Sequence, residues 1–94
     1  MFARVSTYRP APGTTGVPSD ETVQKVLSLP GCKGIYYLAG DEGKSLSITL
    51  WDAKDSLLAS QEPANAIRSA TSTEQNLAIV GVEEFEVLTE QLKD

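Results

Sequence analysis

The run from Lys44 to Asp52, KSLSITLWD, constrains the fold of this 94-residue chain more than any other segment. Its residues alternate strictly, so a β-strand here places Leu46, Ile48 and Leu50 on one face. The opposite face carries hydroxyls and the only tryptophan of the chain, from Ser45, Ser47, Thr49 and Trp51. We therefore predict a strand with one face suited to a hydrophobic core. The second, semipolar face suits either solvent or a ligand pocket.

The rest of the chain predicts the element order β-α-β-β-α-β. Strands are expected over 2–9, 32–39, 44–51 and 82–88, with a hairpin turn at 40–43 and a short extended piece at 78–80. Ser19 is expected to cap the first helix, which ends at the sequence 29–31, Leu-Pro-Gly. Asp52 is expected to cap the second helix, Pro63 to kink or divide it, and the polar stretch 71–76 to fray.

This order predicts one ferredoxin-like α+β domain over 1–94, with a four-stranded antiparallel sheet and both helices on one face. The other face of the sheet must still be covered or solvated. We expect it to carry rings and hydroxyls, from Tyr8, one of Tyr36 and Tyr37, Ser47, Thr49, Trp51, and Glu84 or Glu86. Packing two such faces in a dimer would cover the rings and leave a cavity lined by hydroxyls and aromatic side chains.

Two segments stand outside this pattern. The loop Pro10–Pro18 holds three prolines and two glycines, and it could serve as a pocket lid or as a surface elaboration. The polar tail 89–94 is expected to be flexible.

The composition of the chain argues against several classes of binding partner. The net charge is −5 and the eight basic residues are scattered, which argues against a nucleic-acid partner. The chain lacks an apolar stretch long enough to span a membrane, and Met1–Val5 lacks the pattern of a signal peptide. The single cysteine, Cys32, cannot form an intrachain disulfide. We therefore expect a cytoplasmic protein that binds neither nucleic acid nor membrane.

The chain contains no histidine. Within one chain, this excludes Ser–His–Asp and Cys–His nucleophile systems, as well as metal or haem iron ligated by histidine. No cofactor and no metal is therefore expected.

Several segments together resemble the antibiotic-biosynthesis-monooxygenase type of dimeric α+β barrel, over almost the whole chain. They are the strand end Trp51-Asp52, the helix segment 57–60, the closing strand 82–87, the Pro/Gly loop after the first strand, and 30–34 leading into the second strand. The resemblance implies a homodimer of protomers packed sheet against sheet. It also implies a pocket between each sheet and its helices or at the barrel mouth. Members include cofactor-independent monooxygenases of polycyclic aromatic substrates, haem-degrading enzymes, aldehyde or sugar-phosphate-related enzymes and many proteins without an assigned activity.

The resemblance also bears on the site. Trp51 matches the tryptophan that lines the pocket of the oxygenases, although it could instead plug the end of the sheet under the second helix. Haem-degrading members share an Asn and a His whose positions fall at or near Ser6 and near Gln61, so haem degradation is not expected. Cofactor-free oxygenation needs groups that bind a phenol, help remove its proton and stabilise the anion. The candidate pocket residues are Tyr8, Tyr36, Tyr37, Thr49, Trp51 and Arg68.

We therefore expect a homodimer that binds a small aromatic ligand. Two functions stay open. The first is a cofactor-independent monooxygenase acting on an aromatic or quinol-like metabolite. The second is a non-catalytic ligand-binding or structural dimer.

Overall fold

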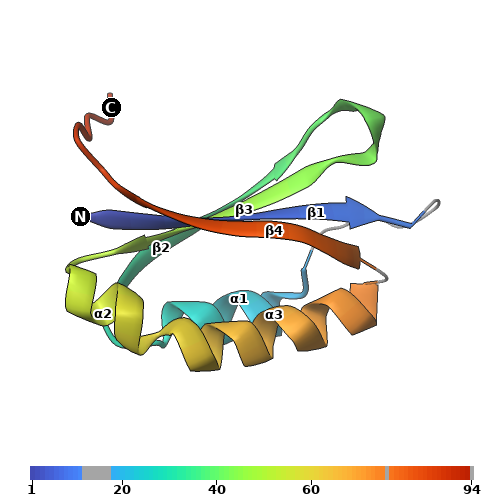
Figure 1. Cartoon of the computed structure of the whole chain (residues 1–94), viewed down its shortest axis with the longest axis horizontal. Helices are drawn as coiled ribbons and strands as arrows, with labels where there is room; N and C mark the ends of the chain where they lie inside the picture. The colour runs from blue at the N-terminus through green and yellow to red at the C-terminus, as the bar shows by residue number, and fades with distance from the viewer. Residues whose placement is uncertain (12–17, 76, 94) are drawn as a thin grey trace.

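The computed structural model describes residues 1–11, 18–75 and 77–93. Over these residues the chain forms two layers, an antiparallel sheet and a layer of helices on one side of it (Figure 1). The strands are β1 (Phe2–Pro10), β2 (Cys32–Ala39), β3 (Ser45–Trp51) and β4 (Leu77–Glu86), in the spatial order β2-β3-β1-β4. The helices are α1 (Asp20–Leu27), α2 (Lys54–Ala59) and α3 (Gln61–Gln75), with a 3₁₀ turn, η1, at Asp41–Gly43. This topology confirms the predicted ferredoxin-like fold.

The pairing of β1 with β3 fixes which side chains share a face. Ser6 pairs with Ser47, on the side that the helices cover. Val5 pairs with Ile48, on the side that faces away from the helices. The predicted assignment of the faces is therefore wrong, because the semipolar face of β3 packs under the helices. Four residues expected on the face without helices, Tyr8, Ser47, Thr49 and Trp51, lie on the helix side instead. The expectation of Glu84 or Glu86 on that face is wrong as well, because these residues pair with Arg4 and Phe2 on the helix side.

The composition of α3 explains this reversal. Its sequence, QEPANAIRSATSTEQ, offers small and polar side chains and only one large aliphatic residue, Ile67. Such a helix can lie close to a sheet face rich in hydroxyls, whereas it has little with which to cover a row of leucine and isoleucine. The interior consequently mixes apolar side chains with buried polar ones. The buried polar residues are Arg4, Ser6, Thr22, Ser45, Ser47, Ser60 and Thr71.

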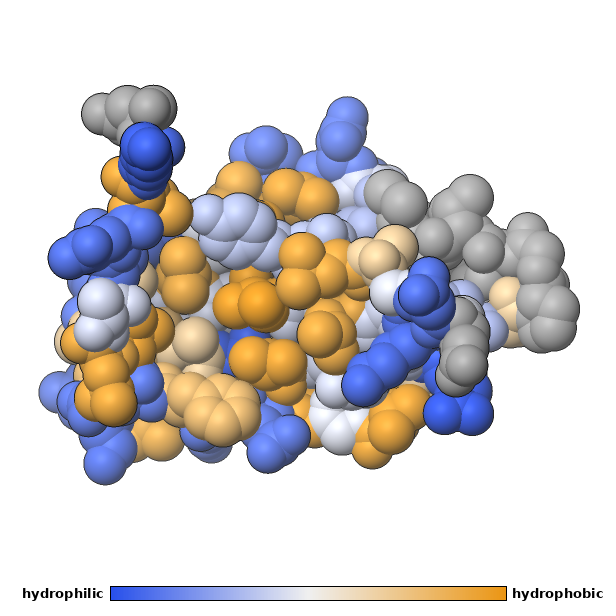
Figure 2. All heavy atoms as spheres, turned by 90° about the horizontal axis from the view of Figure 1, so that it is seen from above, coloured by the Kyte–Doolittle hydropathy of each residue, from blue (hydrophilic) through white to orange (hydrophobic). Residues whose placement is uncertain are grey.

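The side of the sheet away from the helices is apolar and uncovered, and we call it the open face. Figure 2 shows this side, where hydrophobic side chains gather over the middle of the sheet. By strand register it comprises Ala3, Val5, Tyr36, Leu38, Leu46, Ile48, Leu50, Glu83 and Phe85. Tyr36 and Phe85 are each 49% exposed. The C-terminal tail and the β2–β3 hairpin both project on this side, at opposite ends of the molecule (Figure 1).

The helix boundaries test the predicted caps. Ser19 caps α1 as expected, since its Oγ accepts a hydrogen bond from the Thr22 N–H at 3.3 Å. The prediction for Asp52 is wrong, because Ala53 occupies the N-cap of α2 and makes no side-chain cap. The Asp52 N–H instead donates to the Gly31 carbonyl at 2.9 Å, which ties the end of β3 to the start of β2. Pro63 lies in the first turn of α3, where a missing N–H costs little.

The second predicted helix is divided, as the proline suggested, into α2 and α3 with Ser60 between them. The predicted fraying after Thr71 is wrong, because α3 continues to Gln75. Thr71 is buried, and the Ser72 hydroxyl donates to the Leu77 carbonyl, so the end of the helix is attached to β4. The two last extended pieces form one strand, with a register shift opposite Thr7 and Tyr8.

Pro10 belongs to β1, whereas the remainder of the predicted loop lies largely outside the described residues. Among the described helices, none combines the length and the apolar character needed to cross a membrane.

Gly31 offers a test of this packing. Its φ of +81° lies in the left-handed region, and a Cβ added there would overlap the Ser56 side chain and lie 2.7 Å from Asp52 Oδ1. Gly43 has a similar φ of +73°, but an added Cβ meets no described atom within 4 Å. We expect Gly31→Ala to lower the free energy of unfolding by about 3 kcal/mol and Gly43→Ala by only about 1 kcal/mol. Urea denaturation of both variants measures the difference, and equal losses would contradict the close contact at Gly31.

Candidate functional site

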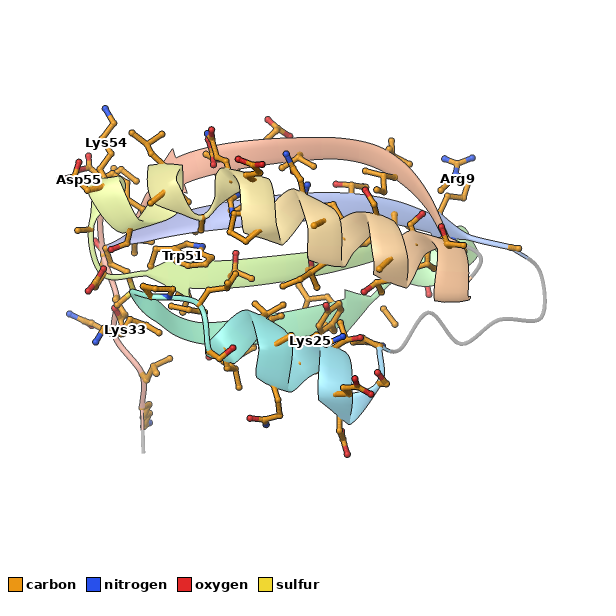
Figure 3. The ribbon with its side chains drawn as sticks, turned by 90° about the horizontal axis from the view of Figure 1, so that it is seen from below. Arg9, Lys25, Lys33, Trp51, Lys54 and Asp55 are labelled. Carbon is orange, nitrogen blue, oxygen red and sulfur yellow. The ribbon has the colours of Figure 1, made fainter. Side chains whose placement is uncertain are left out.

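A cleft lies between the sheet and the helices. Its walls come from strands β1, β2 and β3 and from helices α1 and α3. The lining residues are Arg4, Ser6, Tyr8, Val26, Ile35, Tyr37, Ser47, Thr49, Trp51, Ala64, Ile67, Arg68 and Thr71. Figure 3, viewed from the helix side, shows Trp51 near α2, at the end of the sheet. The free space inside measures about 30 Å³, which is room for one or two water molecules. A benzene-sized guest needs about 150 Å³, so a ring must displace side chains to enter.

Arg4 is the most connected side chain of the cleft, and it is only 3% exposed. Its guanidinium donates to Glu84 Oε2 through Nε at 3.1 Å and through Nη2 at 2.8 Å. It also donates to the Leu57 carbonyl at 2.9 Å and to Ser60 Oγ at 3.0 Å. These contacts join β1, β4 and the break between α2 and α3. The pairing with Glu84 compensates the charge of Arg4 in a place where an unpaired charge would be costly.

Trp51 closes one end of the cleft and has no exposed surface. Its indole Nε1 donates to Thr49 Oγ1 at 2.9 Å, and the Arg4 guanidinium lies 5.5 Å from the centroid of its ring. Thr49 and Trp51 share a strand face, so the bond follows directly from the alternation of β3. Trp51 thus both lines the cleft and fills the end of the sheet, and it combines the two roles that the sequence left open.

Arg68 is the second cation of the cleft, and α3 positions it over the middle of the sheet. It donates through Nε to Ser6 Oγ at 3.2 Å and through Nη1 to Asn65 Oδ1. Burial lowers the pKa of its guanidinium from the ordinary value, and neighbouring Arg4 acts in the same direction. The neighbouring side chains of Tyr8 and Glu84 act in the opposite direction and raise this pKa.

Two tyrosine hydroxyls reach the cleft from neighbouring parts of the sheet. The Tyr8 hydroxyl shares a hydrogen bond of 3.0 Å with Ser47 Oγ. Burial, together with the proximity of Tyr8, raises the pKa of Tyr37 to about 12, while Arg68 acts in the opposite direction. At neutral pH Tyr37 therefore keeps its proton and can donate a hydrogen bond, but it cannot serve as a base.

The structure brings together five of the six pocket residues proposed from the sequence, namely Tyr8, Tyr37, Thr49, Trp51 and Arg68. Tyr36 lies apart from them on the open face, where it pairs with Ile48. The sequence analysis missed Arg4 as a member of the site. A usable signal was present, because Arg4 alternates with Ser6 and Tyr8 and must share their face.

A side hollow of about 190 Å³ adjoins the cleft between α3 and β4. Arg4, Gln61, Asn65, Val82 and Glu84 line it, so Arg4 contacts both spaces. Gln61 Nε2 donates to Glu84 Oε1 at 3.3 Å across this hollow.

The side chains of the cleft are poorly suited to bind a metal ion or haem iron. The described residues contain no cluster of three or more carboxylate, Cys or His side chains that could hold a metal ion. Haem iron takes His, Cys, Met or Tyr as its axial ligand, and only Tyr8 and Tyr37 of these types line the cleft. The raised pKa of Tyr37 disfavours the tyrosinate that iron requires, and the Tyr8 hydroxyl is bonded to Ser47. The residues of the cleft therefore do not fit haem.

The contribution of the buried Arg4 to stability can be compared with that of Lys25, which forms an exposed ion pair with Glu21. Arg4→Met leaves Glu84 without its ion-pair partner and removes one donor each from the Leu57 carbonyl and Ser60 Oγ, so we expect it to lower the free energy of unfolding by about 3 kcal/mol. Lys25→Met removes the exposed partner of Glu21 and should cost less than about 1 kcal/mol. Urea denaturation compares them. A loss at Arg4 no larger than at Lys25 would contradict its structural role.

No protein-family model and no curated protein sequence matches this chain. Solved structures do match it. The haem degrader MhuD of Mycobacterium tuberculosis is 16% identical over 97% of this chain and 99% of its own, with a TM-score of 0.69. SnoaB, a cofactor-independent oxygenase of Streptomyces nogalater, is 13% identical over 98% and 97%, with a TM-score of 0.67. A protein from Deinococcus radiodurans assigned to antibiotic biosynthesis monooxygenases is 14% identical over 100% and 98%, with a TM-score of 0.61. The chain therefore has the ferredoxin-like α+β fold of the antibiotic-biosynthesis-monooxygenase type.

Proposed function

We propose that the protein binds a small aromatic or quinol-like metabolite in the cleft and oxidises it with O₂ without a cofactor. One observation carries the proposal. The side chains of Arg68, Tyr8 and Tyr37 line the same cleft as the Trp51 ring. An indole face suits a flat substrate ring, and the polar groups suit the oxygen of a phenol or quinol. The similarity of the fold to a cofactor-independent oxygenase supports the same reading.

Oxidation of a quinol by O₂ without a cofactor requires few protein side chains. A deprotonated quinol can transfer an electron directly to O₂, and the resulting radicals can combine to a peroxide that loses water. One oxygen atom then stays in the product, the other leaves as water, and the substrate supplies all the electrons. Arg68 would favour loss of the proton to water by stabilising the anion. The hydroxyls of Tyr8 and Tyr37 would donate hydrogen bonds to the same oxygen.

The narrow cleft supports a substrate of one ring. With about 30 Å³ of free space, a ring must displace the half-buried side chains of Tyr37 or Arg68, or enlarge the side hollow. A single ring requires less displacement than the three fused rings of an anthrone. One-ring hydroquinones are therefore the better first substrates.

One observation favours the alternative, a non-catalytic ligand-binding or structural dimer. Trp51 is fully buried and tied to Thr49, so the end of the cleft is already filled. A core residue with this packing needs no ligand to explain it. Turnover separates the two functions.

Oxygen uptake provides that test. We expect the protein to accelerate O₂ consumption with 1,4-hydroquinone above its uncatalysed oxidation, and anthrone to be a poorer substrate. Tyr8→Phe should lower the rate about tenfold, because it removes a hydrogen bond that acts on the developing anion. Tyr36→Phe is the matched control, since Tyr36 lies outside the cleft. Rates equal to the uncatalysed ones would reject the oxygenase, and a full rate in Trp51→Phe would remove Trp51 from the mechanism.

We also propose a homodimer formed through the open face. A continuous apolar sheet surface with half-exposed Tyr36 and Phe85 is uncommon on a monomer. The β2–β3 hairpin and the C-terminal tail project on this side (Figure 1), where they would contact the two ends of a partner's sheet. In contrast to the cavity expected from the sequence, such an interface would be largely apolar, because Ser47, Thr49 and Trp51 lie on the helix side. A single, half-buried Cys32 is consistent with a cytoplasmic location for this dimer.

Sedimentation equilibrium tests the dimer. Ile48 lies on the central strand β3 and pairs with both Val5 and Tyr36, so Ile48→Glu would bury a charge in the interface. We expect the unaltered protein to be a dimer at micromolar concentration and Ile48→Glu to be a monomer. Leu58→Glu, at an exposed position of α2 on the helix side, should remain a dimer. A monomeric unaltered protein at this concentration would contradict the proposal.

A further inference from the structure

The charges of the cleft do not balance, although the chain as a whole is acidic. Two cations, Arg4 and Arg68, are among the lining residues, and none of the described lining residues is a carboxylate. Glu84 lies in the adjoining side hollow and forms its ion pair with Arg4. Within the described part of the chain, the ion pairs are Arg4–Glu84 and Lys25–Glu21, so Arg68 has no carboxylate partner. As far as the described residues go, the cleft thus holds one positive charge without an ion-pair partner, in a protein of net charge −5.

The surroundings of Arg68 leave it able to bind an anion. A guanidinium has five N–H donors. Among the described residues, the hydrogen bonds to Ser6 and Asn65 and the neighbouring Tyr8 engage no more than three of them, which leaves at least two for a ligand. Among the described residues, the hydrogen-bond partners of Arg68 are neutral, and Glu84, which acts on it from a distance, is already paired with Arg4. Burial lowers the pKa of Arg68, as expected for a cation that is partly withdrawn from water without a counter-ion.

We propose that the ligand of this cleft is a monoanion and that Arg68 is the residue that selects it. The anionic oxygen would pair with the free N–H groups of Arg68 and accept a hydrogen bond from the Tyr37 hydroxyl. Arg4 cannot take this role, because Glu84 already occupies it. The inference rests on the proposed ligand-binding function but does not require turnover. It assigns the ligand to the phenolates and aryl carboxylates and excludes neutral rings.

The negative charge of the ligand can come from a carboxylate or from a phenolate, so each class has its own probe. For carboxylates, we compare benzoate with benzamide, its neutral counterpart of nearly equal shape, by titration calorimetry. For phenolates, we use 4-nitrophenol, whose anion absorbs visible light and whose titration is read directly from that band. A site that prefers the anion must lower the apparent pKa of the bound phenol.

Four proteins carry the experiment. Arg68→Gln removes the charge and Arg68→Lys retains it. Arg9→Gln is the matched control, because Arg9 is exposed and points away from the sheet at the far end of β1 (Figure 3). In the unaltered protein and in Arg9→Gln, we expect benzoate to bind at least about tenfold more tightly than benzamide, or bound 4-nitrophenol to show a lowered pKa. Arg68→Gln should abolish both effects, and Arg68→Lys should retain them in weakened form.

Each result has one meaning. A preference for only one probe class supports the inference and identifies the source of the charge. Equal binding of charged and neutral probes, no binding of any probe, or a preference that survives in Arg68→Gln overturns it. Circular dichroism and urea denaturation show whether each variant is folded, and Arg68→Lys provides the test if Arg68→Gln is not. A protein that selects anions but consumes no oxygen would refute only the oxygenase.

Discussion

The buried guanidinium of Arg4 is the interaction on which the rest of the structure depends. It projects from a central strand into the interface between sheet and helices and supplies hydrogen bonds to β4, to the end of α2 and to Ser60 between α2 and α3. A cation in this position is tolerated because Glu84 neutralises it and because Trp51 offers it the face of a ring. The position of Trp51, and with it the end of the cleft, follows from that arrangement.

The same arrangement explains why this fold has its polar residues inside. Once an arginine is buried on the helix side, neighbouring hydroxyls such as Ser6 and Ser47 find partners there, and large aliphatic side chains are placed on the opposite face. Each sheet face then has its own chemistry. The helix face is a hydrogen-bonded network around a small cleft, and the open face is a hydrophobic surface suited to association with a second sheet.

The cleft combines side chains that suit a reaction with very little free space for a substrate. Hydroxyls, a ring and an uncompensated cation are grouped around free space for one or two waters. Such preorganised polar groups act most strongly when bulk water is excluded. A tight cleft achieves that exclusion, and ligand access then depends on the movement of half-buried side chains such as Tyr37 and Arg68. The ligand that we propose, which is small, flat and negatively charged, is consistent with both demands.

The sequence by itself determined the element order, the ferredoxin-like topology, the Ser19 cap and the shared face of Ser47, Thr49 and Trp51, because each depends on local periodicity or on a single turn. It also determined that no histidine chemistry is available. Only the tertiary structure decided which face of the sheet the helices cover, since alternation separates two faces but does not say which one is inside. The ion pair of Arg4 with Glu84 and the hydrogen bond of Arg68 to Ser6 were likewise decided in three dimensions, because each joins residues that are far apart in the chain.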